Sequence, residues 1–581
     1  MKVNRGREAL YPILLNRRQY MTGTTAVYAA KELRWFLERM TGCVYTIKND
    51  EGEAGMRLNL DTNMPEDAFR IFVKDDIFLI TGGKRGVIYG VYELLERLGC
   101  RFFTKDCEKI PVMEELTIPD MEFSDAPKFE YRDHSYTDVI QSLRFAVRCR
   151  LNGNSHKIPE KMGGSKVYAW FVHSFEHMLP TAEFGQTHPE YYALVDGKRV
   201  TIDGGRTQLC LTNPDVLKIA TERVRKRLIE RPDAKIISVS QNDWLGNCQC
   251  EACRKVDAEE GSPSGTLLRF VNKIAENLEE EFPDVLFDTL AYQYTRPAPK
   301  ITRNRKNVCV RLCSIECCFA HPYDVCTDHS RAPLRADGTP SRFIDDLRDW
   351  GGICDRMYIW DYVTCFAHYP MPYPNWRVLQ PNLKLLAANN VKGVFEQGCY
   401  CSRGSTDFNE LRLYLLSKLL WNPDCDIEKH RREFMEYYYG AAGKPLMKYL
   451  DLLCNTAEKT GEHIHYDDNP TAEYLNEENL TKYESLFDEA ASLVSGDAIR
   501  LMRVEKARLS LRWVRMKRKA MLHKEIDVEE FEAFTADWRA HGLSRIDEWY
   551  NLESTHRAFL DDRWRARGYF QHWTGEEPEV L

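Results

Sequence analysis

Residues 235–243 read KIISVSQND. The run Lys235–Ser240 is short and apolar, which predicts a buried strand, and Gln241, Asn242 and Asp243 follow where that strand ends. Seven further strand candidates alternate with amphipathic helices between Phe129 and Leu420: Phe129–Arg132, a poorly defined one near Leu151, Thr207–Leu211, Leu286–Tyr292, Val308–Leu312, Met357–Trp360 and Gly393–Phe395. Eight strands separated by helices predict an α/β fold with a closed (β/α)₈ TIM-type barrel at residues 123–420.

The segments on either side of the barrel have different patterns. Residues 1–122 predict a small α/β unit, with a helical stripe from Ala26 to Met40, a hairpin around Lys74–Asp76 and a helix from Gly86. Residues 421–581 carry apolar residues at helical spacing and almost no strand signal. We therefore expect an N-terminal α/β domain at 1–122 and a C-terminal helical domain at 421–581.

The composition is that of a soluble globular protein, with 43% hydrophobic and 29% charged residues. A net charge of -8 argues against a nucleic-acid partner, and no apolar stretch long enough to span a membrane is present. The polar start Met1–Arg7 lacks the apolar core of a secretory signal, so we expect a cytoplasmic protein, or a secreted or periplasmic one if a signal has been removed. No nucleotide-binding motif indicates a cofactor.

The carboxyl ends of the predicted strands carry the candidate chemistry, because these ends converge on one face of a barrel. Glycoside hydrolysis requires carboxyl groups, and the leading candidates are Asp243, Asp361 and Glu396. Aromatic rings offer apolar faces on which sugars stack, and the candidates are Trp244, Tyr294, Trp360 and Tyr362. His173 and His188, in the loop Trp170–Tyr192, either bind sugar hydroxyls or support that loop. An Asn-Asp pair is also a common turn or helix cap.

Cysteines raise the question of a metal. The chain has 19 of them, scattered in a way typical of reduced thiols. Cys248, Cys250 and Cys253 are spaced closely enough to bind zinc, but the sequence shows no fourth ligand. The position of these cysteines just after the Asn242-Asp243 pair favours a compact loop that shapes the rim of the pocket. The sequence therefore predicts no metal site and leaves zinc at these three cysteines open.

Several segments resemble known glycosidase families. Ala29–Leu33 and Gly86–Tyr92 resemble the small domain that precedes the barrel in glycoside hydrolase families 67 and 20. Over about residues 20–420, the chain resembles glycoside hydrolase family 163, formerly a domain of unknown function. The segments of the barrel that carry this resemblance are Arg132, His188–Tyr191, Leu209–Pro214, Ser240–Asp243, the Cys248, Cys250 and Cys253 loop, and Gly393–Gly398.

This resemblance implies an endo-β-N-acetylglucosaminidase that cuts the chitobiose core of complex N-glycans with help from the substrate's own acetamide. Asn242 would then orient the acetamide and Asp243 would be the acid/base, or Glu396 would donate the proton while Asp243 orients the acetamide. Arg132 and His188 would bind substrate, an oligosaccharide or a glycoprotein glycan. The alternatives are another hexosaminidase, an exo-acting enzyme resembling the α-glucuronidases, and a carbohydrate-binding protein without turnover.

Overall fold

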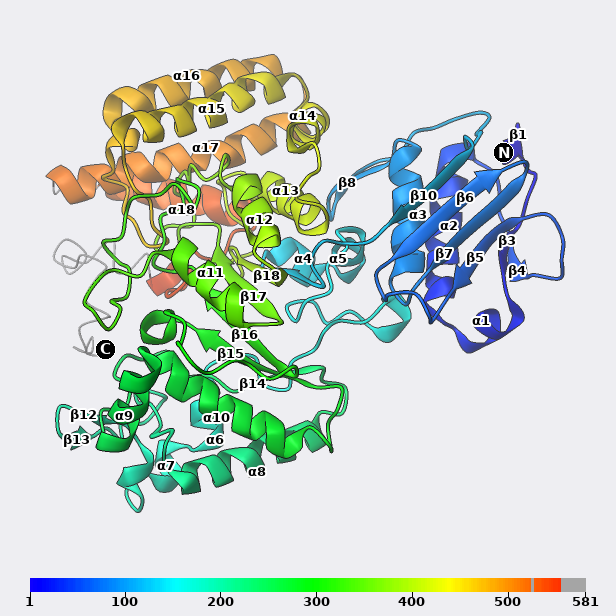
Figure 1. The fold of residues 1–581 in the computed structure, drawn as a ribbon. Helices are drawn as coiled ribbons and strands as arrows, with labels where there is room; N and C mark the ends of the chain where they lie inside the picture. Colours follow the sequence, from blue (N-terminus) through cyan, green and yellow to red (C-terminus); the bar gives the residue numbers. More distant parts are fainter. Residues whose placement is uncertain (524–526, 555–581) are drawn as a thin grey trace.

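The computed structural model describes residues 1–523 and 527–554. Residues 555–581 of the predicted C-terminal domain lie outside the described residues. Figure 1 shows the N-terminal α/β unit as a lobe beside a larger body, which combines a central parallel sheet with the helices of the C-terminal half. The boundaries predicted at 122/123 and 420/421 stay predictions.

The N-terminal lobe is built on a mixed six-stranded sheet with the order β10-β6-β7-β5-β3-β4. The predicted hairpin forms, and the two residues of its turn, Asp75 and Asp76, have φ values of 51° and 63°, as a tight two-residue turn requires. The predicted helices also form, as α2 and α3. The bounds are β3 (Ile13–Leu15), β4 (Ile47–Asn49), β5 (Met56–Leu60), β6 (Phe69–Lys74), β7 (Ile77–Gly82), β10 (Met121–Asp125), α2 (Thr25–Thr41) and α3 (Gly86–Arg97).

The central sheet has six parallel strands in the order β11-β18-β17-β16-β15-β14. These correspond to six of the eight strands that the sequence predicts. Their bounds are β11 (Tyr131–His134), β14 (Ile236–Ser238), β15 (Leu286–Ala291), β16 (Val308–Cys313), β17 (Met357–Tyr362) and β18 (Val391–Gln397).

Two irregular segments run between the edge strands β11 and β14. The Asn152 amide donates to the Arg132 carbonyl at 3.1 Å, and the Lys166 amide donates to the Asn152 carbonyl at 2.8 Å. Further along the same segment, the Ala169 amide donates to the Ile236 carbonyl at 2.8 Å. The prediction of eight regular strands is thus met only in part, because these positions are linked by backbone hydrogen bonds without forming continuous strands.

The prediction of a strand at Thr207–Leu211 is wrong. Leu209 makes only an isolated antiparallel bridge with Tyr192, and the neighbour of β14 is instead Tyr168, which pairs in parallel with Ile236. An apolar run buries its side chains wherever a partner surface is available, so the run alone does not identify the sheet to which it belongs. Here Leu209 joins the main core, and Cys210 packs with Cys248 and Cys253 beside the sheet.

The two faces of the central sheet have different environments, because successive side chains of a strand point to opposite faces. Tyr131, Cys309, Tyr358 and Phe395 share one buried cluster inside the curve of the sheet. On the other face, Nε2 of His134 lies 3.0 Å from the Ser417 hydroxyl of α13. We call these the inner face and the helix face.

Helices cover the helix face and form the C-terminal half. Asn213 caps α8 by accepting a hydrogen bond from the Asp215 amide at 2.9 Å, with Pro214 in the first turn, as predicted. The helices that pack around the sheet are α8 (Pro214–Glu230), α9 (Glu251–Glu260), α10 (Pro263–Leu278), α11 (Phe343–Ile353), α12 (Leu379–Ala388) and α13 (Asn409–Trp421). Those that follow are α14 (Ile427–Tyr438), α15 (Gly443–Thr460), α16 (Glu477–Leu493), α17 (Ala498–Arg518) and α18 (Val528–Ala540).

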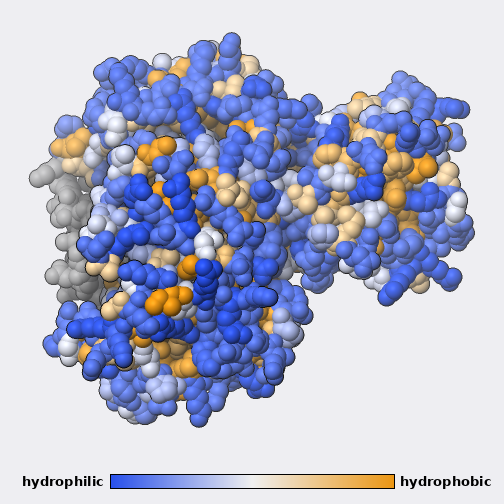
Figure 2. All heavy atoms as spheres, viewed as in Figure 1, coloured by the Kyte–Doolittle hydropathy of each residue, from blue (hydrophilic) through white to orange (hydrophobic). Residues whose placement is uncertain are grey.

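The face of the molecule drawn in Figure 2 is mostly hydrophilic. On this face, the hydrophobic side chains lie in patches that hydrophilic side chains separate. No helix within 1–523 and 527–554 is both long and apolar enough to cross a membrane.

Candidate active site

A pocket of about 200 Å³ lies at the carboxyl ends of the central strands. Five strands contribute lining residues: Asp243 follows β14, and the ends of β15, β16, β17 and β18 supply the others from the sheet. The lining residues are His173, Asp243, Leu290, Tyr292, Cys313, Ile315, Trp360, Tyr362, Phe366, Gln397, Tyr400, Tyr466 and Glu548. The sequence predicted four of them as site residues: His173, Asp243, Trp360 and Tyr362.

Asp243 is an exposed carboxylate in this pocket. The Tyr292 hydroxyl, just after β15, donates a hydrogen bond to Oδ1 of Asp243 at 3.0 Å. Tyr292 itself is buried, so its hydroxyl holds a defined position. The carboxylate is thereby oriented while it stays open to a ligand.

Glu548 is a second carboxyl group in the pocket and comes from the loop after α18. Nε2 of Gln397 donates to Oε1 of Glu548 at 3.1 Å, and Nε1 of Trp360 donates to Oε1 of Gln397 at 2.8 Å. Burial raises the pKa of Glu548 to about 6; a hydrogen bond from Tyr400 opposes the rise and the negative charge of Asp243 adds to it. Glu548 therefore changes its charge near neutral pH.

Aromatic rings form much of the pocket wall. The rings of Trp360 and Tyr362 stack with centroids 6.4 Å apart at 22°. Phe366 and Tyr466 continue this wall, with each ring within 6.4 Å of another member of the group. Flat apolar faces beside carboxyl groups are what a sugar ring requires, because its C–H face stacks while its hydroxyls form hydrogen bonds.

His173 adds a ring nitrogen to the pocket. Its Nδ1 lies 2.9 Å from the Gln241 carbonyl, which can only accept, so Nδ1 is the donor of this hydrogen bond. The backbone of His173 has a φ of 52°, a costly conformation for a residue with a side chain. Its amide donates to the Ser240 hydroxyl at 2.9 Å, and this contact helps to hold the conformation.

Glu396 and Asp361 lie on the helix face and do not line the pocket. They are neighbours in the register of β17 and β18. Asp361 accepts hydrogen bonds from the Ser314 hydroxyl at 2.6 Å, from the Tyr362 amide at 2.8 Å and from Tyr323. Oε2 of Glu396 has no hydrogen-bond partner within the described residues. Burial, and then the charge of Asp361, raise the pKa of Glu396 well above its usual range, so the protonated form of Glu396 is favoured in the folded protein.

Asn242 and Arg132 are occupied by structural contacts. Nδ2 of Asn242 donates to the Thr207 carbonyl at 2.9 Å, and its Oδ1 accepts from the Glu176 amide at 3.0 Å. Nε of Arg132 donates to the Arg150 carbonyl at 2.8 Å, and its guanidinium pairs with Asp67 of the N-terminal lobe at 3.4 Å. Neither side chain lines the pocket.

Three further predicted residues also lie away from the pocket. His188 has a side chain that is 46% exposed, stacks on Tyr191 with centroids 4.6 Å apart, and pairs with Glu190 at 3.0 Å. Tyr294 lines a small crevice beside Cys248 and Cys253. Trp244 contributes its carbonyl to the turn after β14, where it accepts a hydrogen bond from Gln208.

Two groups of residues have the composition of metal sites. Cys210 joins the three cysteines that the sequence singled out, and the four Sγ atoms lie within 4.8 Å of one another. A second group with the same spread combines Cys318, His321, Cys326 and His463. Sequence spacing could not reveal Cys210, because it lies in a different segment, before α8.

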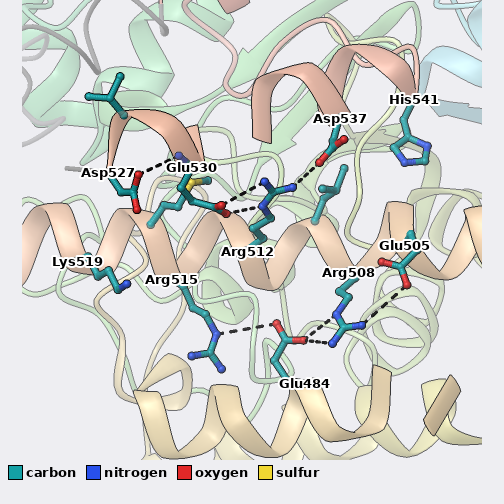
Figure 3. Close-up of a pocket in the computed structure, with 13 residues that line it drawn as sticks. Glu484, Glu505, Arg508, Arg512, Arg515, Lys519, Asp527, Glu530, Asp537 and His541 are labelled. Carbon is teal, nitrogen blue, oxygen red and sulfur yellow. Dashed lines mark hydrogen bonds and ion pairs between the residues drawn. The ribbon is translucent and has the colours of Figure 1, made fainter. Parts of the chain in front are cut away.

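A larger cavity, of about 1130 Å³, lies between α16, α17 and α18. Figure 3 shows Arg508, Arg512 and Arg515 along α17 facing acidic residues of the two neighbouring helices. Arg508 pairs with Glu484 at 2.8 Å, and Arg512 pairs with Glu530 at 2.5 Å. These charges are satisfied within the protein, so the smaller pocket, with its available carboxylate, is the better site for chemistry.

Comparisons with known proteins give one family match. The family model described as "Domain of unknown function (DUF4838)" matches residues 102–451. No curated protein matches the chain.

Solved structures share distant likeness with the chain. A GH138 enzyme targeting pectin rhamnogalacturonan II is 11% identical, with a TM-score of 0.45 over 91% of this chain and 72% of that chain. A β-N-acetylhexosaminidase from Bacteroides fragilis is 11% identical, with a TM-score of 0.43 over 75% and 92%. A GH20 exo-β-N-acetylglucosaminidase from Vibrio harveyi is 10% identical, with a TM-score of 0.42 over 75% and 74%. Similarity at this level carries no argument about the reaction, which depends on the site itself.

Proposed function

We propose that this chain, which belongs to the DUF4838 family, is a glycoside hydrolase acting in the pocket that holds Asp243 and Glu548. One observation carries the proposal: two carboxyl groups share a pocket whose walls are aromatic. One of them is exposed and held by a tyrosine, and the other has a pKa of about 6. This combination suits acid-assisted cleavage of a glycosidic bond.

Glu548 is the proposed acid. It gives its proton to the leaving glycosidic oxygen as the bond from that oxygen to the anomeric carbon breaks. The resulting Glu548 carboxylate then takes a proton from the incoming water. A pKa of about 6 suits both steps, since each protonation state is accessible near neutral pH.

Asp243 is the proposed partner at the reacting sugar. Its carboxylate, oriented by Tyr292, stabilises the positive charge that develops at the anomeric carbon. If the substrate carries a 2-acetamido group, the same carboxylate accepts a hydrogen bond from the acetamide N–H and directs the acetamide oxygen to the anomeric carbon. Asn242 is left out of this role because both of its polar side-chain atoms already bond the backbone.

For the substrate, we propose a β-linked N-acetylglucosamine, with endo-acting cleavage of the N-glycan chitobiose core. This finer proposal rests on the resemblance of the sequence to glycoside hydrolase family 163. The pocket agrees with an uncharged sugar, because no Arg or Lys is among the described residues that line it. A glucuronic acid would require such a cation, so the α-glucuronidase-like alternative lacks its main requirement.

The test uses a complex-type N-glycoprotein and a panel of aryl β-hexosaminides. We expect mass spectrometry to show a glycoprotein that retains one N-acetylglucosamine on asparagine. Asp243→Asn and Glu548→Gln should each lower turnover of the glycoprotein by about 100-fold or more, while the exposed Glu190→Gln control stays active. If no glycan mass changes and no aryl sugar is cleaved, the chain is not this hydrolase.

A further inference from the structure

Four cysteine sulfurs meet beside the loop that presents Asp243. Cys210 precedes α8, Cys248 and Cys250 follow β14, and Cys253 lies in the first turn of α9. Sγ of Cys210 is 3.7 Å from Sγ of Cys250 and 4.0 Å from Sγ of Cys253. All four sulfurs lie within 4.8 Å of one another.

These separations match those around a tetrahedral metal ion. With zinc–sulfur bonds of about 2.3 Å, two sulfurs of a tetrahedral site lie about 3.8 Å apart. A disulfide would instead bring its two sulfurs to about 2.05 Å. The four thiols are thus arranged around a common centre and are not paired.

The surroundings of the sulfurs also suit a metal thiolate. The Leu194 amide donates to Sγ of Cys248 at 3.4 Å, and the Thr212 hydroxyl lies 3.2 Å from Sγ of Cys253. Nη1 of Arg199 approaches Sγ of Cys248 at 3.9 Å. Hydrogen bonds to sulfur, together with a nearby cation, stabilise the net negative charge of a zinc ion with four thiolates.

We propose that Cys210, Cys248, Cys250 and Cys253 bind one structural zinc ion. All four positions are taken by protein ligands, which is the pattern of a structural rather than a catalytic zinc. Gln208, two residues before Cys210, accepts from the Asn242 amide at 3.1 Å and donates to the Asn242 carbonyl at 2.9 Å. The ion therefore clamps two segments that together position Asp243.

A second site is carried independently by different residues. Sγ of Cys318 is 3.3 Å from Nδ1 of His321, and Sγ of Cys326 is 3.7 Å from Nδ1 of His463. A tetrahedral zinc with bonds of about 2.3 Å to sulfur and 2.0 Å to nitrogen separates such atoms by about 3.5 Å. The four ligand atoms also lie within 4.8 Å of one another.

We infer a second zinc ion here, which joins two parts of the chain that are far apart in sequence. The Ala320 and Ile464 amides each donate to Sγ of Cys318 at 3.4 Å, one from either side of the join. His463 lies in the loop after α15, and this loop also carries Tyr466 into the pocket. The ion thus fixes a pocket wall that comes from the C-terminal helices.

Metal analysis of the purified full chain tests both sites. We expect two zinc ions per chain, and one in each of the variants Cys210→Ser and His463→Asn. The matched controls, Cys425→Ser and His329→Asn, belong to neither group and should keep both ions. A variant that keeps two ions would overturn the site it was designed to disrupt.

X-ray absorption at the zinc edge covers the case in which a variant does not fold. The wild-type protein should show on average three sulfurs at about 2.3 Å and one nitrogen at about 2.0 Å per zinc. Absence of zinc, with the thiols instead found as disulfides by mass spectrometry, would overturn both proposals. These readouts do not depend on turnover, so they stand or fall separately from the proposed hydrolase activity.

Discussion

The Tyr292 hydroxyl donates a hydrogen bond to Oδ1 of Asp243 at 3.0 Å, at the edge where β14 and β15 end. A hydrogen bond to a charged group contributes about 1.5–3 kcal/mol. We therefore expect Tyr292→Phe to lower kcat about 10- to 100-fold, because Asp243 loses its fixed orientation. Steady-state kinetics with an aryl β-hexosaminide measure the effect. Tyr437→Phe is the control, as that hydroxyl bonds a distant carbonyl, and equal kcat values in both variants would rule out this role.

The pH dependence of activity should report Glu548. Since the acid must be protonated to donate, kcat/KM should fall as pH rises through about 6, the pKa of Glu548. Glu548→Gln should abolish that limb and lose much less activity on an aryl sugar with a good leaving group, which needs no proton. A falling limb that survives in Glu548→Gln would assign the acid to another residue.

Glu396 should affect stability rather than turnover. Its raised pKa means that the folded state binds a proton more tightly than the unfolded state. This stabilisation is complete below the unfolded pKa of about 4.3 and is lost as pH rises through the raised folded value. In Glu396→Gln, the Tm should therefore decline less with rising pH than in the wild type, while kcat is retained. Loss of turnover in a folded Glu396→Gln protein would instead indicate that Glu396 takes part in catalysis.

Arg132 should stabilise the contact between the N-terminal lobe and the sheet. Its side chain is fully buried and pairs with Asp67 at 3.4 Å. Breaking a buried pair from one side costs about 3 kcal/mol, so Arg132→Met should lower the free energy of unfolding by that amount in a urea titration. The exposed pair Arg225–Glu281 provides the control, and Arg225→Met should leave the free energy of unfolding nearly unchanged, because water and salt screen that pair. A raised KM in a fully stable Arg132→Met protein would instead indicate substrate binding.

The sequence was informative where the pattern is local. Short apolar runs predicted six of the strands in the central sheet, and the rule for barrel ends selected Asp243, Trp360 and Tyr362. The same rule selected Asp361, although it lies on the opposite face from its neighbours. A shift of one residue reverses the face of a strand side chain, and an apolar run buried on both faces carries no alternation that reveals it.

Residues from distant segments could not be predicted in the same way. Glu548 reaches the pocket from the loop after α18, and Tyr466 reaches it from the loop after α15. Cys210 similarly completes a group of four thiols from a separate segment. The spacing of residues along the chain does not predict such long-range contacts, because they depend on how the helices and loops pack against the sheet.

The sequence by itself therefore determined the local structure. The strands of the apolar runs, the helix caps and the turn at Asp75-Asp76 follow from short-range sterics and hydrogen bonding. Only the tertiary structure decided the composition of the candidate active site, because a pocket forms only when distant elements pack together. Folding turned Glu396 toward the helices, where burial raises its pKa, and brought Glu548 into the same pocket as Asp243, where burial and repulsion raise the pKa of Glu548 to about 6. Solvent exposure and charge proximity are properties of the packed molecule, and they decide which carboxyl groups are available for catalysis.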